Sequence, residues 1–182
     1  MSKNVLIATA SKHGSTYDIA DEIARVLSRR GFHVADKPID EVGDVDGYDA
    51  VIVGSAVYAG RWLPEALAFV NRHAAQLGTR PLWLFSSGPI GDPPQPQGDP
   101  QDVAVMVENT HAREHRLFAG LLDPDRLGLG EKVIVGMLRA PRGDFRDFPA
   151  VAAWAEQIAD TLHIGVPGST LSRGALLDAA TQ

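Results

Sequence analysis

The sequence predicts a three-layer α/β fold, a doubly wound, five-stranded parallel sheet with helices on both faces. Apolar segments of strand length alternate with amphipathic segments of helix length along most of the chain. The segment 50–54, A-V-I-V-G, is apolar without alternation, as expected for a strand covered on both faces. With right-handed crossovers, this alternation gives one parallel sheet between two layers of helices.

Each expected element has its own local signal. The first helix presents Ile19, Ile23 and Leu27 at helical spacing, and Gly31 supplies its C-terminal stop. Pro64 suits the first position of a second helix, and Pro149 starts the last one. Strands are expected at 5–9, 33–36, 50–54, 82–85 and 116–119, and helices at 16–30, 64–76 and 150–162.

Composition narrows the classes of function. The 182 residues suit one domain, expected at 1–163, with a loose tail at 164–182. No apolar run approaches the roughly 20 residues of a membrane helix, and no signal peptide is recognisable, so we expect a cytoplasmic location. The formal charge of −6 argues against nucleic acid as a partner. Because the chain has no cysteine, electron transfer would require a cofactor.

A loop dense in hydroxyl groups, T-A-S-K-H-G-S-T at 9–16, joins the first strand to the first helix. The first N–H groups of a helix lack intrahelical partners and attract anions, and glycine allows the backbone to turn tightly around one. The loop therefore predicts a phosphate site; the alternative is an ordinary turn in which Ser15 or Thr16 caps the helix and binds nothing. The candidate phosphate-binding residues are Ser11, Lys12, His13, Gly14, Ser15 and Thr16.

Two further loops are expected to converge with this one. In an open parallel sheet, ligands bind at the carboxyl ends of strands on either side of the point where the strand order reverses. Tyr58 and Trp62 offer faces to a flat aromatic ligand, although Trp62 is equally suited to be a hydrophobic staple for the next helix. The candidate residues are Ser55, Ala56, Val57, Tyr58, Ala59 and Gly60 after the third strand, and Ser86, Ser87, Gly88 and Pro89 after the fourth.

The pattern S-x-x-G-x-T at 11–16 resembles the flavodoxin signature. Together with V-I-V-G-S-A-V-Y-A-G at 51–60, F-A-G-L-L at 118–122 and the final aromatic-bearing helix, it resembles the flavodoxin-domain proteins that include menaquinone-dependent protoporphyrinogen oxidases. The resemblance implies the strand order 2-1-3-4-5, FMN as cofactor, and the isoalloxazine ring beside 55–60. It also implies a peptide flip near Ala59 and Gly60 that follows the redox state, and a helix at 131–138.

Other conspicuous residues have two interpretations each. The proline-rich insertion 91–100 could be a lid, but an inert solvated loop is favoured. His111 and His115 have a metal-compatible spacing without a third ligand, so a solvated pair is favoured and no metal site is predicted. The cluster of Arg139, Arg142 and Arg146 could bind a carboxylate-bearing partner, but an internal salt-bridge cluster with the neighbouring aspartates is favoured.

The sequence therefore predicts an FMN-binding redox protein without an assigned catalytic residue. We favour an oxidoreductase that passes electrons between a small organic substrate and a quinone or a redox partner protein, as the resemblance implies. One alternative is an electron carrier with an open flavin edge and no substrate of its own. The other is a cofactor-free interaction module on the same fold.

Overall fold

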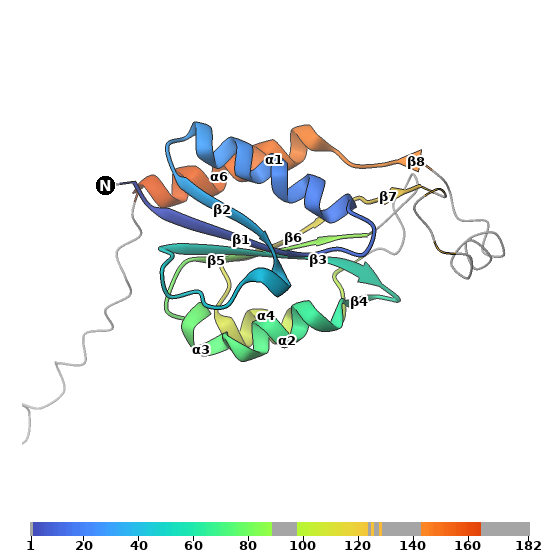
Figure 1. Ribbon diagram of the computed structural model, residues 1–182, viewed down its shortest axis with the longest axis horizontal. Helices are drawn as coiled ribbons and strands as arrows, with labels where there is room; N and C mark the ends of the chain where they lie inside the picture. Colours follow the sequence, from blue (N-terminus) through green and yellow to red (C-terminus); the bar gives the residue numbers. More distant parts are fainter. Residues whose placement is uncertain (1, 89–97, 124, 126–127, 129–142, 165–182) are drawn as a thin grey trace, which may run out of the picture.

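A parallel sheet of five strands, with the order β2-β1-β3-β5-β6, forms the centre of the computed structural model (Figure 1). The structure describes residues 2–88, 98–123, 125, 128 and 143–164. Counted along the chain, these strands have the predicted order 2-1-3-4-5. Their bounds are β1 Asn4–Ala10, β2 His33–Pro38, β3 Ala50–Tyr58, β5 Leu82–Ser87 and β6 Glu114–Phe118.

Helices cover both faces of the sheet, which confirms the three layers (Figure 1). On one face lie α1 (Ser15–Arg29) and α6 (Phe148–Ile164), which pack against each other. On the other face lie α2 (Pro64–Arg72), α3 (Ala74–Leu77) and α4 (Val103–Thr110). Among the described residues, no helix is both long enough and apolar enough to cross a bilayer.

The sheet separates two apolar cores because successive side chains of a strand point to opposite faces. Val5 and Ile7 of β1 pack into the core under α1 and α6, whereas Leu6 and Ala8 pack into the core under α2 and α4. All four side chains are fully buried. This burial on both faces explains why the central strands are apolar without alternation.

Some elements differ from the sequence prediction. The expected helix 64–76 is divided at His73, whose buried ring packs on Phe69 with 4.7 Å between ring centroids. Helix α4 and three short strands were not predicted: β4 (Arg61–Trp62), β7 (Leu121–Leu122) and β8 (Gly143–Asp144). A short 3-10 helix, η1, spans Ile39–Glu41. The expected helix at 131–138, most of the insertion 91–100 and the tail 165–182 lie outside the described residues.

The strand register brings the carboxyl ends of three neighbouring strands together. Ala10 of β1 lies opposite Ser55 of β3, and Ala56 of β3 lies opposite Ser87 of β5. Since the strands are parallel, the loops that follow them leave the same edge of the sheet. The fold therefore assembles the three loops that the sequence singled out.

Candidate functional site

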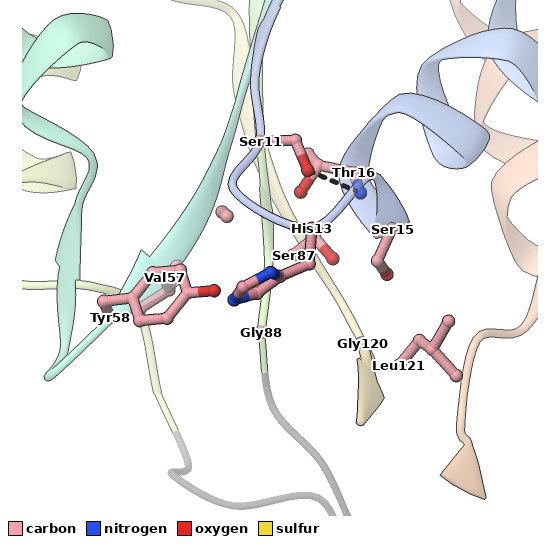
Figure 2. A pocket seen from close by; sticks show the side chains of 11 residues that line it. Ser11, His13, Ser15, Thr16, Val57, Tyr58, Ser87, Gly88, Gly120 and Leu121 are labelled. Atoms are coloured by element: carbon pink, nitrogen blue, oxygen red, sulfur yellow. Dashed lines mark hydrogen bonds between the residues drawn. The ribbon is translucent and has the colours of Figure 1, made fainter. Parts of the chain in front are cut away.

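A pocket opens at this edge of the sheet, and all three predicted loops contribute to it (Figure 2). The β1–α1 loop forms one side, the end of β3 another, and the end of β5 a third. Two residues that follow β6, absent from the prediction, complete the lining. The lining residues are Ser11, His13, Ser15, Thr16, Ala56, Val57, Tyr58, Ser87, Gly88, Gly120 and Leu121.

The β1–α1 loop is held by its own hydroxyl and glycine. Ser11 Oγ accepts a hydrogen bond from the backbone N–H of Gly14 at 3.0 Å. It also accepts one from the backbone N–H of Thr16 at 3.4 Å (Figure 2). Gly14 immediately precedes α1 with φ of 88°, a left-handed conformation that favours glycine. The turn therefore delivers the amino end of a 15-residue helix, with its partial positive charge, directly to the pocket.

The hydroxyl of Ser15 is the best indication of a ligand. Ser15 Oγ is buried, has no hydrogen-bond partner among the described residues, and belongs to a residue that lines the pocket. A buried hydroxyl without a partner costs about 1–3 kcal/mol. An anion with several acceptor oxygens at this helix terminus would remove that cost. The donor set therefore fits a phosphate group.

A tight hairpin follows β3 and presents Tyr58 to the pocket. Tyr58 pairs with Arg61 across the two-residue turn Ala59–Gly60, where φ is 50° and 75°. Tyr58 is 39% exposed, and its ring lies beside His13, with 6.3 Å between ring centroids (Figure 2). Gly60 C=O accepts a hydrogen bond from the N–H of Gln101, which ties the hairpin to the segment before α4. A redox-linked peptide flip at this turn stays a prediction.

The predicted serines at the ends of β3 and β5 differ in whether they line the pocket. Ser87 lines the pocket, but Ser55 and Ser86, which are register partners, are fully buried. Ser55 Oγ donates to Ala56 C=O and accepts from Leu63 N–H. Adjacent residues of a strand point to opposite faces, so the side chains of Ser86 and Ser87 take different directions, and of these two only Ser87 lines the pocket. The hydroxyls of Ser55 and Ser86 therefore form hydrogen bonds in the interior and do not line the pocket.

Trp62 lies in the interior and offers no face to the pocket. Its side chain is 2% exposed and packs in the core under α2 and α4. Its indole N–H donates to Ser86 Oγ at 2.7 Å. Of the two interpretations left open by the sequence, the packing role beside α2 is the one that agrees with this position.

His115 is buried, so the prediction that His111 and His115 are both solvated was wrong for His115. Its side chain is 4% exposed, and Nε2 lies 2.7 Å from Ser86 Oγ. Nδ1 lies 3.1 Å from the Asp99 carboxylate, although without the alignment of a hydrogen bond. Burial lowers the pKa of His115, so the neutral ring is favoured. Ser86 Oγ is fully buried and already accepts a hydrogen bond from the Trp62 indole. The pair of Ser86 and His115 therefore does not present a nucleophile to the pocket.

His111 is exposed at the end of α4, in a left-handed conformation with φ of 54°. No group of three or more potential metal ligands occurs within the described part of the chain.

Two glycines allow backbone segments to meet at the lining of the pocket. Gly88 and Gly120 are in contact: a Cβ on Gly120 would lie 3.3 Å from Gly88 Cα. A Cβ on Gly88 would lie 2.9 Å from the Cβ of Val57. Side chains at either position would press neighbouring pocket walls apart, which explains the requirement for glycine.

The remaining predicted residues have different positions. Lys12 is exposed, and its ammonium lies 5.2 Å from the centroid of the Tyr58 ring. Arg146 binds Asp18 and Asp144, which agrees with the favoured internal salt-bridge cluster. Arg139, Arg142 and Pro89 lie outside the described residues.

A model of the flavodoxin domain matches residues 6–148 of the chain. The chain belongs to the flavodoxin-domain family. FMN is the cofactor of this family. This assignment agrees with a loop that fits a phosphate at the amino end of α1 and with the strand order of the sheet.

Among curated proteins, the chain is similar to protoporphyrinogen IX dehydrogenase [quinone] of Escherichia coli K12. The two are 30% identical over 139 residues, which cover 75% of this chain and 70% of the relative. Among solved structures, a flavodoxin from the domain Archaea has a TM-score of 0.62 at 13% identity, covering 88% of this chain and 99% of its own. The rubredoxin oxygen:oxidoreductase of Desulfovibrio gigas has a TM-score of 0.63 at 14% identity, covering 88% of this chain but 36% of that one. The structural matches show the fold.

Sequence reasoning missed Gly120 and Leu121 as pocket residues. They belong to the motif F-A-G-L-L at 118–122, which the sequence singled out only for its resemblance. The rule that loops at the carboxyl edge converge could have included the loop after the fifth central strand as well.

Proposed function

We propose that the protein is an FMN-dependent oxidoreductase that passes electrons between an organic substrate and a quinone or a redox partner protein. The unpartnered hydroxyl of Ser15, beside the amino end of α1 in the pocket, carries the cofactor part of the proposal. The relative named protoporphyrinogen IX dehydrogenase [quinone] supports the choice of substrate and acceptor.

At the phosphate end, each residue of the chain has a separate task. Ser11 shapes the turn by accepting from the N–H groups of Gly14 and Thr16. The Ser15 hydroxyl and the first-turn N–H groups of α1 donate to phosphate oxygens. Because the loop already holds the backbone donors in place, little conformational freedom is lost when the phosphate binds.

The flavin ring would lie beside the lining residues contributed by the other loops, among them Val57, Tyr58, Gly88, Gly120 and Leu121. When bound, FMN supplies reversible one- and two-electron chemistry, and the protein supplies its orientation and surroundings. The partly exposed Tyr58 leaves an approach to this end of the pocket.

That exposure also favours the second candidate function, an electron carrier without its own substrate. A carrier needs an accessible flavin edge for a docking protein, and Tyr58 at 39% exposure lies at such an edge. The archaeal flavodoxin, 99% of which is covered by this chain, supports this candidate.

Titration of the purified apoprotein with FMN, followed by the absorbance and fluorescence of the flavin, tests cofactor binding. Replacing Ser15 by Ala removes one phosphate donor, so FMN should bind about tenfold more weakly, at a cost of about 1.4 kcal/mol. Riboflavin, which lacks the phosphate, should bind the wild type and S15A equally. Ser28→Ala, at an exposed position further along α1, is the matched control. A protein that takes up neither compound would be the interaction module instead.

The two redox functions differ in what reoxidises the loaded protein. An oxidoreductase reduced by an organic donor should return its electrons to a soluble menaquinone analogue within its catalytic cycle. Protoporphyrinogen IX is the first donor to try, because it is named in the relative. Reoxidation only by a protein acceptor, with no turnover of a small donor, would support the carrier.

A further inference from the structure

We propose that Arg146 is a positioning residue for the phosphate site, because its guanidinium offsets the negative charge of Asp18 in the first turns of α1. The inference rests on the proposed binding of FMN. It concerns a residue that lies far from the phosphate loop in the sequence and does not line the pocket.

Arg146 connects α1 to the β7–β8 ribbon through three hydrogen bonds. Its Nη1 donates to Asp18 Oδ2 at 2.5 Å, its Nη2 to Asp144 Oδ2 at 2.7 Å, and its Nε to Asp144 Oδ1 at 2.8 Å. The Arg146 side chain is only 9% exposed, and its guanidinium also packs 5.0 Å from the ring centroid of Phe148. The hydrogen bonds from Arg146 lower the pKa of Asp144, so this carboxylate stays ionised. The group is therefore a fixed, charged cluster.

Asp18 lies close enough to the phosphate loop to matter. It follows Ser15 by three residues, and residues three apart lie on the same helix face with Cβ atoms about 5–6 Å apart. Its N–H donates to Gly14 C=O, so Asp18 closes the first turn of the helix that faces the pocket. A carboxylate here is favourable for the helix itself, but repels a second anion bound at the same terminus.

The charge balance of the cluster defines the role of Arg146. With two carboxylates and one guanidinium, Asp18, Asp144 and Arg146 carry a net charge of −1. Replacing Arg146 by Gln would leave −2 beside a phosphate that itself carries about −1.5 to −2. Replacing Asp18 by Asn in the same protein would restore −1. Pairing the two partly exposed carboxylates with one mostly buried cation is what keeps α1 able to accept a phosphate.

Arg146 also stands next to the pocket wall. Leu121, which lines the pocket, pairs with Asp144, and Phe145 N–H donates to Gly120 C=O. A purely structural role would be to hold this wall, and it predicts a different result. Loss of the wall would weaken the binding of both FMN and riboflavin. Loss of the charge compensation would weaken the binding of FMN alone, because only FMN carries a phosphate.

The experiment compares FMN with riboflavin on the purified apoprotein by fluorescence titration at low ionic strength. In Arg146→Gln, the dissociation constant of FMN should rise about tenfold, while that of riboflavin should change less than about twofold. The double variant D18N/R146Q should recover FMN binding to within about threefold of the wild type, because its local charge is the same. Arg25→Gln is the matched control: Arg25 pairs with Glu22 further along α1, so its loss changes the net charge equally but far from the helix terminus.

Circular dichroism and thermal unfolding establish that each variant is folded. Should R146Q fail to fold, Arg146→Lys keeps the charge without the forked geometry and should retain the preference for FMN over riboflavin. Equal losses of FMN and riboflavin, or an unchanged FMN affinity in folded R146Q, would overturn the charge role. A wild type that binds riboflavin and FMN with equal affinity would overturn the charge role as well. A wild type that binds neither flavin would instead refute the proposed function, and this inference with it.

Discussion

Replacing Gly54 by Ala should destabilise the sheet at its centre. Gly54 of β3 lies opposite Phe85 of β5 in the register, and the Phe85 ring occupies the space above it. A Cβ on Gly54 would lie 2.1 Å from Phe85 Cζ and 2.2 Å from Cε1. Since no real carbon atoms approach so closely, the ring would have to move.

The surroundings of Phe85 determine the cost of that movement. The side chain is fully buried, and its ring meets those of Phe118 and Trp154 edge to face, with centroids 6.2 Å apart in each case. Moving the ring therefore displaces the core under α1 and α6. Overpacking of this kind costs about 1–3 kcal/mol. For a domain of this size, the midpoint of thermal unfolding should fall by about 2–12 °C.

Thermal and urea unfolding, followed by circular dichroism, measure this effect. Gly47→Ala is the matched control, because a Cβ at Gly47 meets no atom within 4 Å. Adding Phe85→Leu to G54A should recover part of the lost stability, since the smaller side chain leaves room for the new Cβ at position 54. A G54A protein that unfolds within about 1 °C of G47A would refute the reasoning from the Phe85 contact.

Two further predictions concern the pocket and the edge of the sheet. Gly88→Ala places a Cβ 2.9 Å from the Cβ of Val57, so the folded variant should bind FMN at least about tenfold more weakly in a fluorescence titration. Burial, with a smaller contribution from Asp21, raises the pKa of Asp36 to about 7. Because the folded pKa exceeds the unfolded value, stability is fully present below about pH 4 and is lost as the pH rises through 7. Asp36→Asn should therefore raise the urea midpoint at pH 8 relative to the wild type, with little change at pH 4.

Each of these has a control. Gly43→Ala adds a Cβ that meets nothing within 4 Å and should leave FMN binding unchanged. A G88A variant with wild-type affinity would show that the Val57 contact does not shape the pocket. For Asp36, equal gains from the Asn variant at pH 4 and pH 8 would show that ionisation of the carboxyl is not the cause.

The architecture could be predicted because its signals are local. The apolar stripe of Ile19, Ile23 and Leu27 shows which face of the first helix is buried. The apolar run at 50–54 shows in the same way that both faces of that strand are covered, whichever segments pack against it. Helix α4 was missed because its apolar stripe is weak and it follows a proline-rich segment with no helical signal. The strands β7 and β8 were missed because each has only two residues and depends on a partner more than 20 residues away.

The sequence by itself determined the turn between β1 and α1, since Ser11, Gly14 and the start of α1 lie within a few residues and their hydrogen bonds are local. Only the tertiary structure decided which hydroxyls face the pocket. Ser86 and Ser87 are the same residue type, yet the direction of each depends on the register of β5 in the sheet. The pairing of Arg146 with Asp18, 128 residues apart, likewise follows from the packing of α1 beside the β7–β8 ribbon, because long-range contacts have no local pattern that encodes them.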